Sequence, residues 1–222
     1  MPNRASELEW DEPESSGTSQ LTRARVVQAG LDIADAEGLD AVSIRRVALA
    51  LDVRPMSLYS HIASKNDLLA LMLNEVSGRL LVPDPLPDDW RAALRAIARR
   101  AYDAYVAHPW MVQAFGSGTR VGPNMLRRAE QSAAAVASLE LDPGDAWIAL
   151  GIVHEWTLGH ALHVVTLRED SALETQMRSA EPEEFPRMSE VFGEGRLQSQ
   201  ERAFEVALET VLDGIERRFG AE

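Results

Sequence analysis

A short run of polar side chains between positions 54 and 65 has the chemistry of a nucleic-acid contact surface. Arginine can donate a pair of hydrogen bonds to guanine or to a phosphate, serine can donate or accept, and methionine can pack on a thymine methyl group. Tyrosine, histidine and lysine can reach the phosphate backbone. The residues with these side chains are Arg54, Met56, Ser57, Tyr59, Ser60, His61 and Lys65.

Two short helices are expected to position these side chains. Ser43 can cap a first helix, whose apolar residues recur at helical spacing as Ile44, Val47, Ala48 and Leu51. Asp52 tolerates a left-handed backbone and can make a sharp turn. A second helix is then predicted from Pro55 to about Ile62. This pattern is typical of a helix-turn-helix, in which the second helix enters the major groove of DNA.

The preceding segment completes a small three-helix head, and the following segment leads out of it. Thr22 can cap a preceding helix that ends at Gly38, and Ser64 opens a following helix, whose free N–H groups favour a phosphate. Residues at the starts of the helices of this region are also expected to contact DNA. They are Thr22, Arg23, Ser43, Arg45 and Pro55.

The stretch from Thr22 to Asp67 resembles the DNA-binding domain of the tetracycline-repressor (TetR) family of bacterial transcription regulators. The resemblance rests on Val42-Ser43-Ile44-Arg45 and on the run Leu58-Tyr59-x-His61-Ile62-x-x-Lys65. It implies a homodimer that binds a palindromic DNA operator, most often as a repressor, and releases it when a small-molecule effector binds.

Charge is distributed unevenly along this acidic chain of 222 residues, whose formal net charge is −13. Residues 1–20 carry −4 and residues 67–222 carry −10, whereas residues 21–66 carry +1. Non-specific DNA binding is therefore expected to be weak, because it scales with the number of phosphates neutralised. The chain has no cysteine, and we find neither a signal peptide nor a run of apolar residues of membrane-spanning length, so a cytoplasmic location is expected.

Helical patterns alone follow the head, so the predicted class is all-α. We expect a disordered acidic arm over residues 1–20, a helix-turn-helix domain over 21–67, and a helical ligand-binding and dimerisation domain over 68–222. The arm is either a solvated tail or a competitor of phosphate for nearby basic residues. After the helix-turn-helix, helices are expected over about 64–80, 89–107, 124–139, 145–168 and 200–219, with a short helix around 185–192.

The helix after Asp145 is apolar nearly all round. The last helix also has more apolar residues than a single core-facing side would require. Pairing both helices with their copies across a two-fold axis would form a four-helix interface. The open alternative is that both helices pack only within one monomer.

A ligand pocket is expected among the helices of the second domain, since helical bundles commonly bind ligands there. Thr119-Arg120 and the segment from Glu155 to His160 resemble tetracycline repressors themselves, whose drug binds as a magnesium chelate. Gly116 and His163 stand where that group has a metal-ligating histidine and a glutamate, so tetracycline is doubtful as the effector. The candidate pocket residues are Ala101, Trp110, Phe115, Thr119, Arg120, Trp147, Leu150, His154 and His163, and Trp156 could also form a wall.

No cofactor, metal or catalytic residue is predicted. His154, Glu155, His160 and His163 suggest a metal site, but they do not share one helix face, and buried or pocket histidines are the expected reading. One alternative is an all-α enzyme or ligand-binding protein that uses this histidine-rich helix. Another is a helical interaction protein that no longer binds DNA. Against an enzyme, the chain lacks a nucleophile–base spacing, a zinc-protease motif and a glycine-rich phosphate loop.

Overall fold

The computed structural model describes residues 8, 10, 21–116, 120–167, 181, 183–192 and 200–219. These ranges contain helices and no strand, which confirms the all-α prediction. They also contain no helix that is long and apolar enough to cross a bilayer. The chain divides into two compact units, Met1–Glu140 and Leu141–Glu222.

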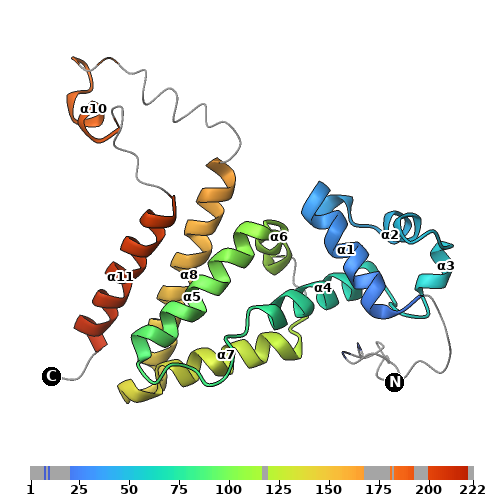
Figure 1. Ribbon diagram of the computed structural model, residues 1–222, viewed down its shortest axis with the longest axis horizontal. Coiled ribbons are helices and arrows are strands. Elements are labelled where there is room, and N and C mark those ends of the chain that lie inside the picture. Colours follow the sequence, from blue (N-terminus) through green and yellow to red (C-terminus); the bar gives the residue numbers. More distant parts are fainter. Residues whose placement is uncertain are drawn as a thin grey trace, which may run out of the picture. The chain divides into compact units, whose positions relative to one another are not determined.

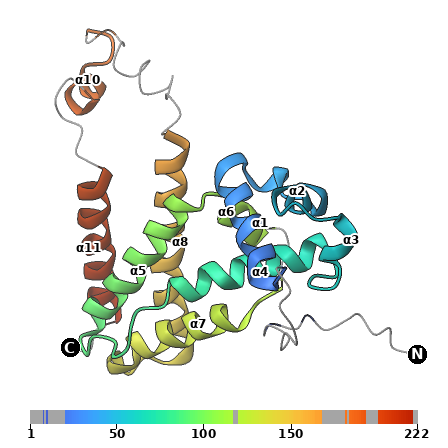
Figure 2. The same ribbon diagram turned by 45° about the vertical axis from the view of Figure 1, so that its right-hand side comes forward.

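The first unit gathers one long helix and two short ones around the beginning of a second long helix (Figures 1 and 2). The fourth helix packs against the first helix on one side and against the seventh on another. The helices of this unit are α1 (Arg23–Glu37), α2 (Ile44–Ala50), α3 (Pro55–Leu58), α4 (Lys65–Arg79), α5 (Trp90–Ala107), α6 (Trp110–Gly116) and α7 (Pro123–Ala135), with the 3₁₀ turns η1 (Leu39–Ala41) and η2 (Ala137–Leu139).

The predicted helix caps are confirmed. The side-chain oxygens of Thr22, Ser43 and Ser64 accept hydrogen bonds from backbone amides three residues ahead, at 3.2, 3.2 and 3.1 Å. Each bond satisfies an amide that the first helical turn leaves without a partner. The starts of α1, α2 and α4 are thus set by local chemistry.

The turn between α2 and α3 is left-handed, as predicted. Asp52 has φ 54°, a backbone conformation in which most side chains are strained. The following helix is shorter than predicted, because α3 ends at Leu58 and residues 59–61 continue as a turn. The amide of Ile62 still donates to the Leu58 carbonyl at 3.0 Å, and both side chains are buried in the head.

Helix α4 is buried over most of its length, from Asp67 to Leu73 and again at Val76 and Ser77. Asn124 joins it to the start of α7. The Asn124 amide N–H donates to Asn74 Oδ1 and its side-chain Nδ2 donates to the Asn74 carbonyl, both at 2.9 Å. A Cβ at Gly78 would lie 2.6 Å from Asn124 Nδ2, so glycine is needed for this close approach.

Two segments of the first unit differ from the prediction. Helix α6 was not expected, since His108-Pro109 and the glycines after it indicated an irregular stretch. The helix predicted over 124–139 ends as α7 at Ala135 and continues through the 3₁₀ turn η2 to Glu140, whose φ is 51°. The structure describes only Leu8 and Trp10 of the arm over residues 1–20. The predicted disorder of this arm therefore concerns residues that lie outside the described ones.

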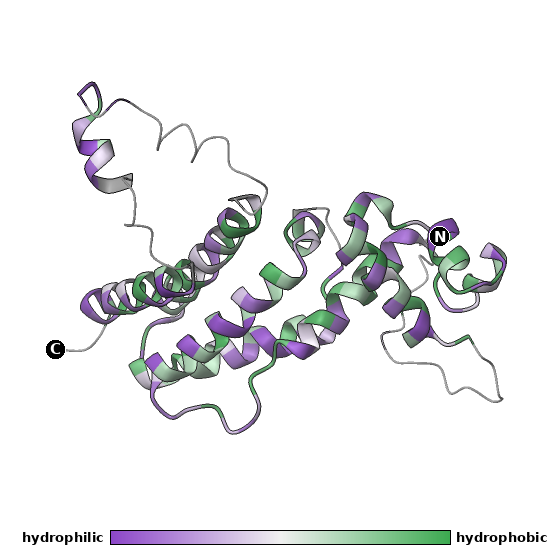
Figure 3. Ribbon diagram, turned by 45° about the horizontal axis from the view of Figure 1, so that its top comes forward, coloured by the Kyte–Doolittle hydropathy of each residue, from purple (hydrophilic) through white to green (hydrophobic). Residues whose placement is uncertain are grey.

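The second unit contains α8 (Pro143–Leu167), α10 (Pro186–Phe192) and α11 (Gln200–Phe219), close to the predicted ranges. Helices α8 and α11 lie side by side. Asp142 caps α8, because its Oδ1 accepts from the amides of Gly144 and Asp145 at 2.8 and 3.2 Å, and these bonds lower the pKa of Asp142. Hydrophobic and hydrophilic residues occupy different sides of many helices (Figure 3).

A row of rings joins the two long helices of this unit. The rings of Trp156 and His160 on α8 stack with centroids 5.3 Å apart, and Trp156 also stacks on Phe204 of α11 at 5.3 Å. Burial lowers the pKa of His160, and the charge of His163 lowers it further. No group of three potential metal ligands occurs in the described part of the chain.

Replacing His160 with glutamine should make stability less sensitive to acid. The folded chain holds the pKa of His160 below its ordinary value of 6.5, so the unfolded chain takes up the proton first as the pH falls. The wild-type free energy of unfolding should therefore decrease as the pH falls from 7 to 5, and less steeply in His160→Gln. Urea unfolding of both proteins at several pH values measures these free energies. The same pH dependence in the wild type and in His160→Gln would contradict the prediction.

Candidate DNA-binding surface and effector residues

The predicted recognition residues lie on the outer side of the head. Met56 is 76% exposed and Tyr59 is 49% exposed, although both side chains are largely apolar. On the opposite side, Leu58 and Ile62 are buried, so packing fixes the segment in the head. A large apolar side chain left in water at this place has no role in the core, and it is free to contact a base edge.

The remaining polar side chains of this surface are also accessible. Arg54, Pro55, Ser57, Ser60 and Lys65 are exposed, and His61 is half-buried. The Ser60 hydroxyl donates to the Ser57 carbonyl at 2.8 Å, which leaves its oxygen able to accept. Arg54 precedes α3 and its side chain makes no cap hydrogen bond.

Arg23 connects the start of α1 to the end of the recognition segment. Its Nε donates to the backbone carbonyl of His61 at 3.1 Å, and the side chain is half-buried. The bond joins two segments that are distant in sequence, and so it fixes His61 relative to the capped start of α1. Arg23 therefore has a positioning function in addition to its predicted contact with DNA.

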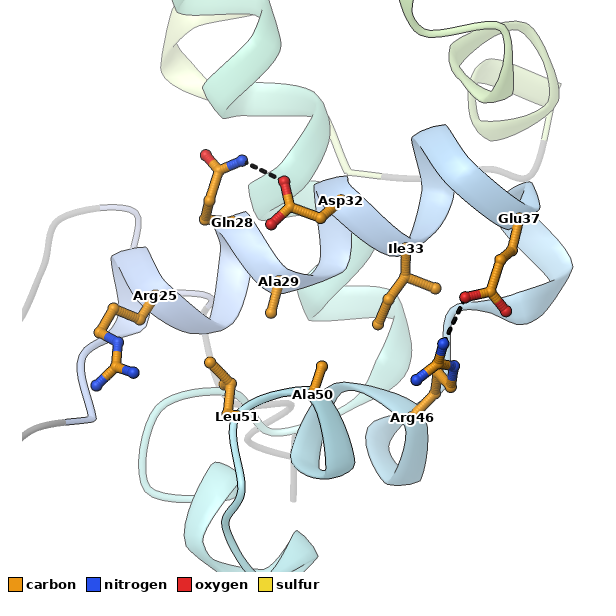
Figure 4. Close-up of a pocket in the computed structure, with 9 residues that line it drawn as sticks. All are labelled: Arg25, Gln28, Ala29, Asp32, Ile33, Glu37, Arg46, Ala50 and Leu51. Carbon is orange, nitrogen blue, oxygen red and sulfur yellow. Dashed lines mark hydrogen bonds and ion pairs between the residues drawn. The ribbon is translucent and has the colours of Figure 1, made fainter.

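Arg45 and Arg46 are adjacent on α2 but differ in their surroundings. Arg45 is exposed, whereas Arg46 forms an ion pair with Glu37 at the end of α1. Figure 4 shows this pair at one end of an open groove of about 410 Å³ between α1 and α2. Gln28 donates to Asp32 at 2.7 Å on the α1 side of the same groove. The groove lies entirely within the head and contains none of the predicted effector residues.

Of the predicted effector residues in the first unit, one is closely tied to the head. Trp110 is 2% exposed, and its indole N–H donates to Asp35 of α1 at 2.6 Å. The His108 ring lies 2.7 Å from the same Asp35 oxygen. Trp110 thus belongs to the packing between α6 and α1.

The other predicted pocket residues of this unit have varied environments. Ala101 is buried on α5, and Phe115 on α6 meets Tyr105 edge to face with centroids 6.2 Å apart. Arg120 is exposed and lies 3.0 Å from Asp67 of α4. Thr119 lies outside the described residues.

Helix α8 carries the predicted effector residues of the second unit. Trp147 is 79% exposed, Leu150 is half-buried, and His154 and His163 are exposed. Trp156 is half-buried in its stack of rings. A shared pocket for all nine candidates remains a prediction.

Two acids, Asp35 and Asp67, contact predicted functional residues without having been identified from the sequence. Both belong to helices of the head region, where they bind Trp110 and Arg120. Their positions within helices gave no signal, because each contact joins residues far apart along the chain.

A capped helix-turn-helix with exposed recognition residues, joined to further helices, defines a DNA-binding transcription regulator. The protein-family model described as "Tetracyclin repressor-like, C-terminal domain" matches residues 82–219 of this chain. The transcriptional repressor DrrR1 of Streptomyces coeruleorubidus is 32% identical over 230 residues, which cover 96% of this chain and 85% of that protein. The class A tetracycline repressor of Escherichia coli from transposon 1721 is 27% identical, in a match that covers 90% of this chain and 93% of that protein.

Solved structures agree with these sequence matches. The complex of the TetR family protein ActR of Streptomyces coelicolor with actinorhodin superposes with a TM-score of 0.76 at 27% identity, over 91% of this chain and 98% of that one. The apo form of ActR gives a TM-score of 0.74, also at 27% identity, over 90% of this chain and 96% of that one. The chain belongs to the tetracycline-repressor (TetR) family of transcription regulators.

Exchanging Arg23 for lysine tests its positioning function. Lysine keeps the positive charge but lacks the Nε–H group that reaches the His61 carbonyl. Losing one such hydrogen bond costs about 1 kcal/mol, or roughly a five-fold loss of DNA affinity if the bond orders the bound state. Fluorescence anisotropy with a DNA duplex measures the loss, and Arg25→Lys on the same turn is the control. Equal affinities for the two variants would contradict the prediction.

Proposed function

We propose that this protein is a transcriptional repressor that binds a palindromic operator as a homodimer and releases it when a small-molecule effector binds. The exposed recognition surface carries the proposal, with Met56, Tyr59 and Lys65 accessible on a head whose opposite side is buried. Such a regulator would act in the cytoplasm, where its DNA is, and we assign it no catalytic activity.

Three side chains of the recognition surface have a proposed task. Arg54 donates to a guanine or a phosphate, and Met56 packs on a thymine methyl group. Lys65, at the start of α4, binds a phosphate together with the free amides of that helix. With a net charge of only +1 over residues 21–66, the head gains little from phosphates alone, so base contacts and a second head must supply much of the affinity.

The outer face of α8 supports the homodimer. Four large apolar residues, Trp147, Ile148, Ile152 and Leu162, are 42–79% exposed on this helix. At helical spacing they share one side with the exposed Glu155 and with Gly151 and Gly159, where an added Cβ would meet no atom within 4 Å. Ala149, Val153, Thr157, Ala161 and Val164 form the buried side.

An apolar face of this kind is expected to be covered by another protein surface. The two glycines allow a second helix to approach closely, and Val206 on the neighbouring α11 is 59% exposed as well. A second copy of α8 and α11 would complete a four-helix interface. Two heads related by the two-fold axis would then enter major grooves about 34 Å apart on a palindromic operator.

The relatives support a small-molecule effector. ActR has been solved in complex with actinorhodin and with (S)-DNPA, and further relatives are tetracycline repressors. For this chain we propose an effector other than a magnesium–tetracycline chelate, since Gly116 and His163 stand where the tetracycline repressors have a metal-ligating histidine and a glutamate. The effector acts only through a difference in its affinity for the DNA-binding and DNA-released conformations.

The DNA-binding function is tested by titrating the full chain against a duplex taken from beside its own gene, with a scrambled duplex as reference. Tyr59→Ala should weaken binding to both duplexes. Lys65→Ala should do the same and reduce the slope of log affinity against log salt by about one, the value for one phosphate contact. Arg187→Ala removes an exposed charge of α10 and is the control for charge. A wild-type chain that binds both duplexes equally would contradict the proposal.

The dimer is tested by placing a charge on the exposed face of α8. Leu162→Asp should shift the chain from dimer to monomer in sedimentation velocity, because an unpaired charge in an apolar interface costs several kcal/mol. Operator affinity should fall at least ten-fold at the same chain concentration. Glu130→Arg, an exposed charge change on α7, should leave both measurements unchanged. If Leu162→Asp remains dimeric, this face is not the interface.

A further inference from the structure

A carboxylate is buried at the point where the head joins α4. Asp67, in the first turn of α4, has a side chain that is only 3% exposed. Its Oδ2 accepts from the Ser64 hydroxyl at 2.9 Å, and the Ser64 oxygen accepts from the Asp67 amide at 3.1 Å. The second oxygen, Oδ1, is buried and makes no hydrogen bond of standard geometry. A buried carboxylate in this state requires a nearby positive charge.

Arg120 supplies that charge from outside the head. Its Nη2 lies 3.0 Å from Asp67 Oδ1, so the two side chains form an ion pair. The arginine side chain is 50% exposed, so solvent reaches one member of the pair while the other is enclosed. Such a pair can open by movement of the arginine alone.

The pair acts on a turn that carries DNA-contacting groups. Lys65 is exposed two residues before Asp67, and the recognition segment ends at Ile62, just before the Ser64 cap. If Arg120 withdraws, the carboxylate loses its compensation and is stabilised by moving toward water. That movement would draw the first turn of α4 away from its present position.

We propose that Arg120 is a positioning residue for DNA binding. By compensating the buried carboxylate of Asp67, it holds the first turn of α4, and Lys65 with it, in the arrangement that contacts an operator phosphate. The inference rests on the proposed function. It assigns a role in DNA binding to a residue that lies far outside the helix-turn-helix.

The same residue also connects this role to the effector. Arg120 is one of the predicted effector contacts, and it directly follows Thr119, another of them. An effector with a carboxylate, phenolate or other acidic group would compete with Asp67 for the guanidinium group. Binding of an acidic effector would then release the first turn of α4 without any direct contact between the effector and the head.

A substitution series on the full chain tests the positioning role with the operator duplex and its scrambled reference. Arg120→Leu leaves a buried carboxylate without compensation and should weaken operator binding about ten-fold. Arg120→Lys keeps the charge and should stay within about three-fold of wild type. The double variant Asp67→Asn/Arg120→Leu removes the carboxylate as well, and should recover most of the lost affinity. Arg187→Leu is the control for loss of an exposed arginine.

Amide hydrogen exchange gives a second measurement that does not depend on DNA. Arg120→Leu should accelerate exchange over residues 64–70 and leave α11 unchanged, and the double variant should slow it again. Should Arg120→Leu fail to fold, Arg120→Lys and the double variant still test the proposal, since both retain a balanced charge at this position.

The outcomes separate this inference from the proposed function. A wild-type chain that does not distinguish the duplexes contradicts the proposed function, and the positioning role with it. Specific wild-type binding with unchanged affinity in Arg120→Leu contradicts the positioning role alone. A double variant that binds no better than Arg120→Leu also contradicts it, because the loss of DNA affinity would then not come from the uncompensated carboxylate.

Discussion

Burial of α4 on nearly every side is the constraint on which the arrangement of the first unit depends. This helix packs on α1 of the head and on α7, so a change in its position must alter both contacts. The double hydrogen bond between Asn74 and Asn124 and the close approach at Gly78 make its junction with α7 stiff. Its first turn is held by the Ser64 cap and by the ion pair between the enclosed Asp67 carboxylate and the solvent-exposed Arg120. Under the proposed role of Arg120, the rigid end and the releasable end belong to the same helix.

Local chemistry made much of the fold predictable from the sequence. The caps at Thr22, Ser43 and Ser64 and the left-handed turn at Asp52 depend on the residue and its immediate neighbours, and all were predicted. Helix α6 was missed because its seven residues follow His108-Pro109 and end at a glycine, a pattern that also suits a loop. The ends of α3 and α7 were misplaced because packing and a 3₁₀ turn, and not residue preference, end these helices.

The candidate sites were predictable to different degrees. The recognition residues follow from their place in a helix-turn-helix, since the buried Leu58 and Ile62 determine which neighbours face outward. The partners of Trp110 and Arg120 could not be derived in the same way. Asp35 and Asp67 reach them only after the chain has folded back on itself, and a single sequence carries no periodicity that reports such pairs.

The exposed apolar face of α8 has a consequence for the quantity of protein a cell must make. A chain that binds DNA only after pairing through this face fills its operator in proportion to the square of its concentration, as long as single chains predominate. A small rise in synthesis would then close the promoter sharply, and a small fall would open it. Residues such as Leu162 and Ile152 would thereby help set the threshold at which the regulated genes respond.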